Sequence, residues 1–91
     1  MFKTLEELIA IIRQRKDSSA EESYTKKLLK NKKLSIEKVR EEIAELIDAI
    51  EKNSNKVHES ADVIYHLMVL LEANDIKIED VMDELKKRQK K

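Results

Sequence analysis

Apolar residues recur along this chain at intervals of three and four positions, the spacing of one face of an α-helix. The most apolar stretch is residues 58–71, HESADVIYHLMVLL, which nevertheless carries Glu59, Asp62 and His66. At about 100° per residue its apolar side chains spread over most of a helix circumference, which is typical of a helix buried among others. The three polar residues fall on one remaining stripe, so this central helix takes two carboxylates into its packed surroundings.

The pattern predicts four further helices around the central one, which is expected to end near Asn74. A capping box of Thr4 and Glu7 opens the first helix, which continues to about Lys16. Residues 17–22 are expected to form an exposed loop. Ser23 or Thr25 then caps a short basic helix that stops near Asn31, a residue type that tolerates the left-handed conformation at helix ends.

Ser35 is expected to cap the helix before the central one, from Ile36 to about Lys52, and the last helix is expected from Ile78 to about Arg88. Besides the central helix, the side chains predicted to face the core are Leu5, Leu8, Ile9, Ile12, Ile36, Val39, Ile43, Leu46, Ile47, Ile50, Ile78, Val81, Met82 and Leu85. The fold class is therefore all-α: one domain over residues 1–91, like a four-helix bundle with an additional short helix. Because the central helix is apolar on more sides than a chain of 91 residues can cover, we expect a homodimer.

Composition excludes several classes of protein. The 19 basic and 19 acidic residues cancel, so no overall field draws nucleic acid or a membrane surface to the chain. The absence of cysteine excludes disulfides and Cys-ligated zinc, and no apolar run approaches the ~20 residues of a membrane span. We expect a soluble cytoplasmic protein. The absence of glycine and proline excludes Gly-rich phosphate loops and leaves the tight turns to Asn and Ser.

The acidic residues suggest a metal site. Glu42 and Glu45 repeat the i, i+3 spacing of Glu59 and Asp62, and two antiparallel helices carrying such pairs can surround a hard cation such as Mg²⁺. The alternative is that Glu42 and Glu45 form a solvated helix edge. Zinc or iron would recruit more histidine; His66 is expected to be a hydrogen-bonded supporting residue and not a ligand. The remaining polar residues are less specific: Tyr65 suits core packing or ligand contact, His58 suits an ordinary first turn, and the lysines of residues 26–33 suit a solvated surface or an anion site.

Four segments carry a resemblance to a known family. Residues 41–45, EEIAE, and 59–62, ESAD, resemble the EExxE and ExxD signature of the all-α, MazG-like nucleotide pyrophosphatases. SYTKKLL at 23–29 and ADVIYHLMVLL at 61–71 resemble more narrowly the phosphoribosyl-ATP pyrophosphatases of histidine biosynthesis. Two positions depart from that family's usual glycine, namely Arg40 before the glutamate pair and Glu22 before SYT.

The resemblance implies a MazG-type fold and Mg²⁺-dependent hydrolysis of phosphoribosyl-ATP to phosphoribosyl-AMP and pyrophosphate, the second step of histidine synthesis. It implies a metal shell of Glu42, Glu45, Glu59 and Asp62, with Glu41 and Glu42 as catalytic candidates and Glu41 orienting or deprotonating the water. The phosphate-binding candidates are Ser23, Tyr24, Thr25, Lys27 and Lys38, and the supporting residues are Tyr65 and His66. Two further functions stay open: a house-cleaning pyrophosphatase acting on free nucleoside triphosphates, and a non-catalytic helical oligomerisation module.

Overall fold

A computed structural model describes residues 2–17 and 23–89 of the chain. These ranges hold five helices and no strand, which confirms the all-α prediction and the additional short helix: α1 (Lys3–Asp17), α2 (Tyr24–Lys30), α3 (Lys32–Lys52), α4 (Lys56–Ala73) and α5 (Ile78–Arg88). Most of the predicted loop, residues 18–22, lies outside the described residues, and so does the departure at Glu22.

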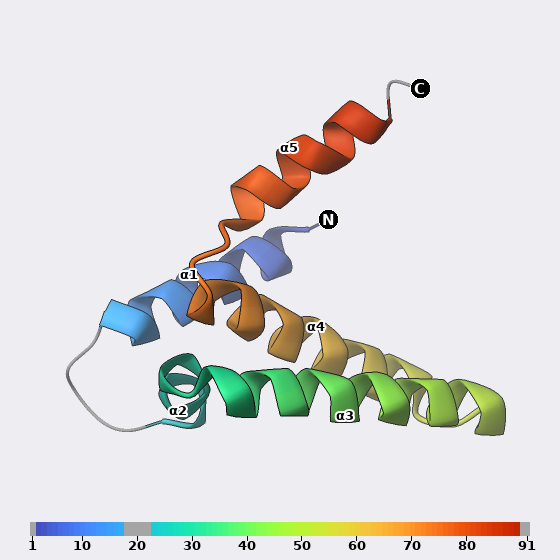
Figure 1. Cartoon of the computed structure of the whole chain (residues 1–91). Coiled ribbons are helices and arrows are strands. Elements are labelled where there is room, and N and C mark those ends of the chain that lie inside the picture. The colour runs from blue at the N-terminus through green and yellow to red at the C-terminus, as the bar shows by residue number, and fades with distance from the viewer. Residues whose placement is uncertain (1, 18–22, 90–91) are drawn as a thin grey trace.

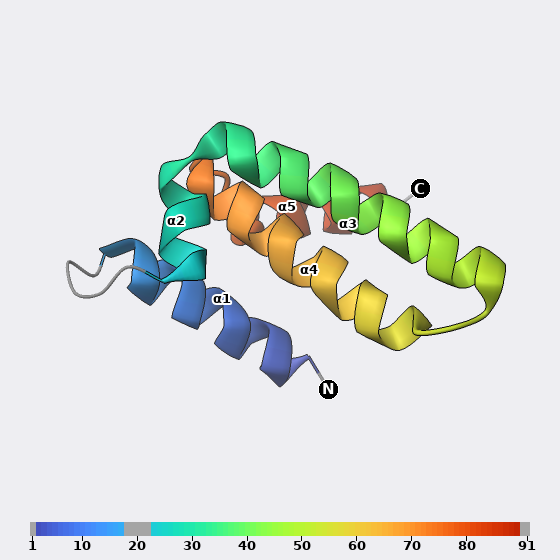
Figure 2. The same ribbon diagram turned by 90° about the horizontal axis from the view of Figure 1, so that it is seen from below.

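The two longest helices, α3 and α4, lie side by side as an antiparallel hairpin (Figures 1 and 2). Helices α1 and α2 pack against one end of this hairpin, where the side chains of Ile12, Leu28 and Val69 are almost completely buried. Leu29, Met68 and Ala73 complete this small core. The core therefore occupies one end of the hairpin and leaves the other end as two helices alone.

Asparagine makes the turn between the hairpin helices. Asn53 and Asn55 both adopt the left-handed conformation, with φ of 56° and 54°, which confirms that Asn takes the place of glycine there. The predictions at other helix ends were partly wrong. Helix α1 already begins at Lys3, so Thr4 lies inside it. Asn31 is extended, and its side chain caps α3 by accepting a hydrogen bond from the Leu34 amide.

Ser35 was predicted to cap the third helix, and this was wrong. It lies inside α3, where it is buried and its hydroxyl donates a hydrogen bond to the carbonyl of Leu28, 2.6 Å away. The same carbonyl, near the C-terminal end of α2, also accepts a hydrogen bond from the backbone amide of the C-cap residue Asn31, at 3.2 Å. The serine therefore joins α2 to α3 instead of starting α3.

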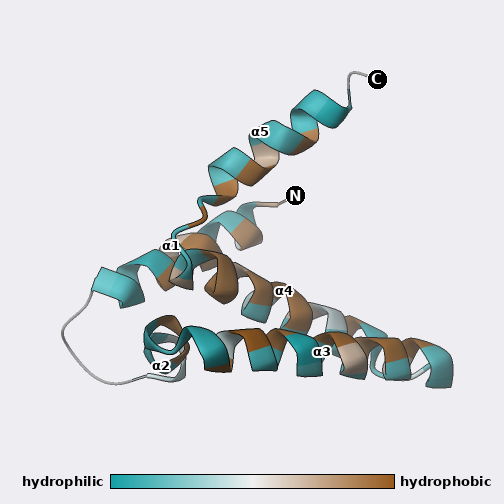
Figure 3. Cartoon of the chain, viewed as in Figure 1, coloured by the Kyte–Doolittle hydropathy of each residue, from teal (hydrophilic) through white to brown (hydrophobic). Residues whose placement is uncertain are grey.

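Two of the predicted core-facing stripes are largely exposed. On α3 only Val39 and Ala49 are buried among apolar residues, whereas four isoleucines are 41–56% exposed: Ile36, Ile43, Ile47 and Ile50. Helix α5 has no buried residue and projects away from the hairpin (Figure 1). Periodicity identified the apolar faces correctly, but α3 packs mainly against α4, and the far side of its stripe has no helix over it in the described ranges. Figure 3 shows the resulting apolar positions along α3 and α4.

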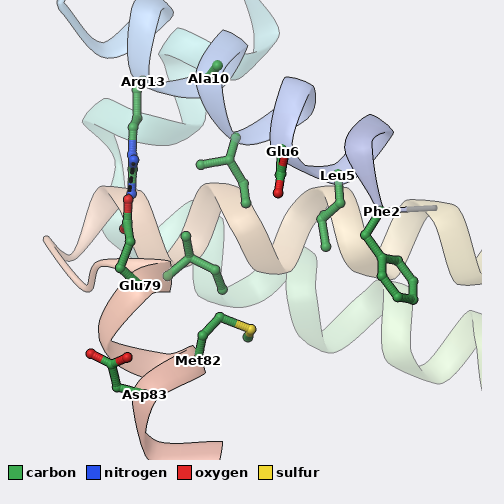
Figure 4. A pocket seen from close by; sticks show the side chains of 10 residues that line it. Phe2, Leu5, Glu6, Ala10, Arg13, Glu79, Met82 and Asp83 are labelled. Carbon is green, nitrogen blue, oxygen red and sulfur yellow. Dashed lines mark hydrogen bonds and ion pairs between the residues drawn. The ribbon is translucent and has the colours of Figure 1, made fainter. Parts of the chain in front are cut away.

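An open cleft of about 750 Å³ lies between helices α1 and α5. Figure 4 shows Phe2, Leu5 and Met82 along it, with Arg13 and Glu79 pointing toward each other at one end. Arg13 donates two hydrogen bonds to the Glu79 carboxylate, at 2.6 and 2.9 Å, and this ion pair ties the first turn of α5 to α1. None of the predicted metal-binding carboxylates lines the cleft, and its walls are mostly apolar. Among the described residues, no helix is long and apolar enough to cross a membrane.

Candidate active site

The hairpin brings three of the four predicted metal-binding carboxylates together. Glu42 and Glu45 lie one turn apart on α3, and Glu59 lies in the first turns of α4, which runs back alongside α3. One oxygen from each of the three carboxylates lies within 4.8 Å of the other two. Helical spacing and antiparallel packing therefore bring these three carboxylates together, while their role as metal ligands stays a prediction.

Asp62 belongs to a second, overlapping group. This second group consists of Asp62, Glu59 and His58, so Glu59 belongs to both groups. The Nε2 atom of His58 lies 3.4 Å from Asp62 Oδ2 and 3.9 Å from Glu59 Oε1. His58 was expected to be an ordinary residue of the first turn, so its place beside the carboxylates was not predicted. The signal was available, since His58 and Asp62 are four positions apart on one helix and therefore neighbours.

Glu42 is the carboxylate most affected by this crowding. Its pKa is raised to about 7, chiefly by a hydrogen bond with the Glu45 carboxyl, and further by burial and by the charges of Glu45, Asp62 and Glu59. Its Oε2 is buried and has no hydrogen-bond partner among the described residues. A buried, unpaired carboxylate oxygen is unfavourable unless a proton or a cation compensates its charge.

These observations fit a divalent, oxygen-preferring cation. Up to four carboxylates converge from two helices, and no lysine or arginine of the described residues forms an ion pair with Glu42, Glu45, Glu59 or Asp62. The Glu42 oxygen without a hydrogen-bond partner points to the same conclusion, because a bound metal ion would coordinate it. The donor set is dominated by oxygen, which suits Mg²⁺ better than zinc.

The three hydroxyl groups predicted to bind phosphate all have partners within the chain. Ser23 caps α2 by accepting a hydrogen bond from the Lys26 amide at 3.1 Å. The Tyr24 hydroxyl lies 2.9 Å from His66 Nε2, and the Thr25 hydroxyl is hydrogen-bonded to that of Tyr65. The structure thus gives these residues a role in holding α2, while their contact with phosphate stays a prediction.

The two lysines predicted to bind phosphate differ in their surroundings. Lys27 is exposed on α2. Lys38 forms an ion pair with Glu41 at 3.1 Å, and this hydrogen bond raises the pKa of Lys38. Lys38 also lies near enough to Tyr24 to oppose the rise that burial causes in the pKa of that tyrosine. Lys38 is therefore close to both Tyr24 on α2 and the carboxylate of Glu42, whereas Arg40 is exposed on α3.

His66 is buried. Among the four predicted metal-binding carboxylates of the described residues, it lies near Glu42, with Nδ1 at 3.9 Å from Oε1. Its Nδ1 also lies 2.8 Å from the backbone oxygen of Asp62, one turn earlier on α4. Tyr65 packs edge-on against the His66 ring and parallel to the Tyr24 ring, with centroid distances of 4.9 and 6.4 Å. Both residues therefore sit in the contact between α2 and α4.

Comparison with known proteins gives a consistent result. The sequence model of the family described as phosphoribosyl-ATP pyrophosphohydrolase matches residues 5–89. The phosphoribosyl-ATP pyrophosphatase of Metallosphaera sedula is 44% identical over 93 residues, which cover 99% of this chain and 100% of that protein. That of Haloarcula marismortui is 42% identical, covering 92% and 91%. The histidine biosynthesis bifunctional protein HisIE of Pyrococcus furiosus is 46% identical over 94% of this chain, which spans only 41% of that longer protein.

Proposed function

The chain belongs to the phosphoribosyl-ATP pyrophosphohydrolase family, and on this basis we propose that it hydrolyses phosphoribosyl-ATP to phosphoribosyl-AMP and pyrophosphate in histidine biosynthesis. The observation that carries the proposal is the buried Glu42 oxygen without a partner, in a group of carboxylates from two helices. A cation bound there would lie close to Lys38, beside the helix that begins with SYTKKLL. A cytoplasmic location is part of the same proposal.

We propose Mg²⁺ as the cofactor, held by Glu42, Glu45 and Glu59, with Asp62 completing the set. When bound, it would neutralise charge on the phosphoric anhydride and acidify a bound water. The protein's contribution is to present the carboxylates in advance, on two helices whose turn is fixed by Asn53 and Asn55.

Other residues of the chain would bind the phosphates and accept the proton of the attacking water. Lys27 and Lys38 offer cationic donors to the phosphates, and charge-assisted contacts of this kind are the strong ones. Glu41 lies next to Glu42 in sequence and pairs with Lys38, so it can accept a proton from an attacking water once Lys38 turns to a phosphate. Proximity and charge neutralisation are the main requirements of phosphoryl chemistry, and these residues supply both.

The comparison of substrates tests the proposal. The experiment measures kcat/KM for phosphoribosyl-ATP and for ATP, GTP, CTP and UTP with the same enzyme preparation, by release of pyrophosphate. The proposal predicts a large preference for phosphoribosyl-ATP. A house-cleaning pyrophosphatase would favour one of the ordinary triphosphates, and a non-catalytic helical module would release no pyrophosphate from any of them.

We further propose that the protein is a homodimer formed through the hairpin. Ile43, Ile47 and Ile50 on α3 and Ile64 and Leu67 on α4 are 37–56% exposed. Two hairpins paired about a two-fold axis would make a four-helix bundle and bury these side chains. This arrangement would supply the covering that one chain lacks on the far side of α3.

A further inference from the structure

Helix α2 cannot hold its position by itself. It has seven residues, and an isolated helix of that length is unstable in water. Its place is set by burial of Leu28 and Leu29 in the core and by hydrogen bonds from its first two residues to α4. Whatever α2 presents to a substrate therefore depends on these contacts.

His66 connects α2 with the stretch of α4 that carries the carboxylates. A backbone carbonyl can only accept, so the contact of 2.8 Å with the Asp62 oxygen requires the proton on Nδ1. In the neutral ring Nε2 is then an acceptor, and the Tyr24 hydroxyl donates to it over 2.9 Å. The ring is thus hydrogen-bonded at both nitrogens, to the backbone of a carboxylate residue and to the first residue of α2.

The packing around this connection leaves the ring little freedom. The side chain of His66 is 8% exposed, and the rings of Tyr24 and Tyr65 meet it edge-on with centroid distances of 5.8 and 4.9 Å. The hydrogen bond between Thr25 and Tyr65 adds a parallel connection from the next residue of α2 to the preceding residue of α4. Two adjacent pairs of this kind fix both the distance and the rotation of α2 relative to α4.

We propose that His66 is a positioning residue that acts through Tyr24. It holds α2, and with it Lys27, at the distance from the carboxylates that the phosphate chain of the substrate must span. This inference rests on the proposed function, because it takes the substrate to bridge Lys27 and the carboxylate group. In this arrangement the Tyr24 hydroxyl is hydrogen-bonded to His66 and not to the substrate.

Steady-state kinetics with phosphoribosyl-ATP at saturating Mg²⁺ tests the inference in four variants. Tyr24→Phe removes only the hydroxyl. His66→Asn retains a donor near the position of Nδ1 and removes the acceptor at Nε2, whereas His66→Gln retains an acceptor there. The double variant of Tyr24→Phe and His66→Asn measures whether the two residues act as one unit.

The expected result is a rise in KM of roughly three- to tenfold for Tyr24→Phe and for His66→Asn, the effect of losing one hydrogen bond, with kcat within about twofold. The double variant should be no worse than either single one, and His66→Gln should restore KM to within about twofold of the wild type. The dissociation constant of Mg²⁺ alone, measured by calorimetry, should not change in Tyr24→Phe.

Three results would overturn it. If Tyr24→Phe raises KM but His66→Asn does not, Tyr24 contacts the substrate directly. If both variants lower only Tm and leave KM unchanged, the hydrogen bond serves packing alone. If the wild type does not turn over phosphoribosyl-ATP at all, the proposed function fails and takes this inference with it, an outcome distinct from the other two.

Discussion

Replacing Glu42 with glutamine should stabilise the metal-free protein at alkaline pH and remove its response to Mg²⁺. In the wild type, the Glu45 carboxyl, burial and the neighbouring charges raise the pKa of Glu42 from the ordinary 4.5 to about 7. The native state therefore binds a proton more tightly than the unfolded state. Between pH 4.5 and about pH 7 the stability of the metal-free wild type falls as pH rises. Above about pH 7 the full destabilisation by the ionised Glu42 carboxylate is present.

The magnitude follows from the size of that shift. Each pKa unit corresponds to about 1.4 kcal/mol, so the difference between 4.5 and about 7 sets an upper bound of roughly 3.5 kcal/mol. The Glu42 side chain is 15% exposed, and solvent and movement of Glu45 reduce the cost to about 2 kcal/mol. In a chain of this size, 1 kcal/mol shifts Tm by roughly 4–8 °C, so Glu42→Gln should raise Tm by about 8–16 °C at pH 8.5.

Thermal unfolding with a chelator, followed by circular dichroism at pH 5 and pH 8.5, measures this difference. The gain of the variant should be large at pH 8.5 and clearly smaller at pH 5, where most of the fall in wild-type stability has yet to occur. Addition of Mg²⁺ should then raise Tm of the wild type and leave that of Glu42→Gln almost unchanged, because ligand binding stabilises only the protein that binds it. A variant that melts lower than the wild type at pH 8.5 without metal would refute the reasoning, since Glu42 would then be a stabilising residue and not a strained one.

The remaining predictions concern the phosphate-binding helix, the α1 to α5 ion pair and the dimer. Lys27→Ala should weaken binding of phosphoribosyl-ATP by roughly ten- to hundredfold and Lys33→Ala by little, as measured by isothermal titration calorimetry; equal effects would contradict a phosphate contact at Lys27. The Arg13 hydrogen bonds lower the pKa of Glu79 to about 2. The stability that this ion pair contributes is therefore present above about pH 4.5 and lost as pH falls toward 2. In Glu79→Gln, Tm should decrease less over that pH range than in the wild type. Ile47→Glu should yield monomers in light scattering, whereas Ile11→Glu on α1, at similar exposure, should leave the dimer intact.

The helices and the cluster of carboxylates could be predicted from the sequence for the same reason. Both depend on spacing along a single helix: apolar residues at three and four positions define the faces, and Glu42 with Glu45 necessarily shares one side of α3. The antiparallel return of α4 follows from a turn too short for any other path. Glu59 therefore had to come back alongside α3.

The features that were missed depend on contacts that spacing does not encode. Ser35 has the local signature of a helix cap, yet its hydroxyl donates to Leu28 across the junction of two helices. The Tyr24 to His66 hydrogen bond joins residues 42 positions apart, and no periodic pattern indicates it. The apolar stripe of α3 was recognised as apolar, but periodicity does not say whether the same chain covers it. Four isoleucines at 41–56% exposure show that most of this stripe is left uncovered, namely Ile36, Ile43, Ile47 and Ile50.

The most direct test of the central claim is pyrophosphate release from phosphoribosyl-ATP, followed across a titration of Mg²⁺ for the wild type and for Glu42→Gln. The wild type is expected to form pyrophosphate and phosphoribosyl-AMP in equal amounts, at a rate that saturates with Mg²⁺ and falls to zero when a chelator is added. Glu42→Gln is expected to lose at least about a hundredfold in rate. Turnover that is independent of a divalent cation, or a variant that retains the wild-type rate, would contradict the central claim.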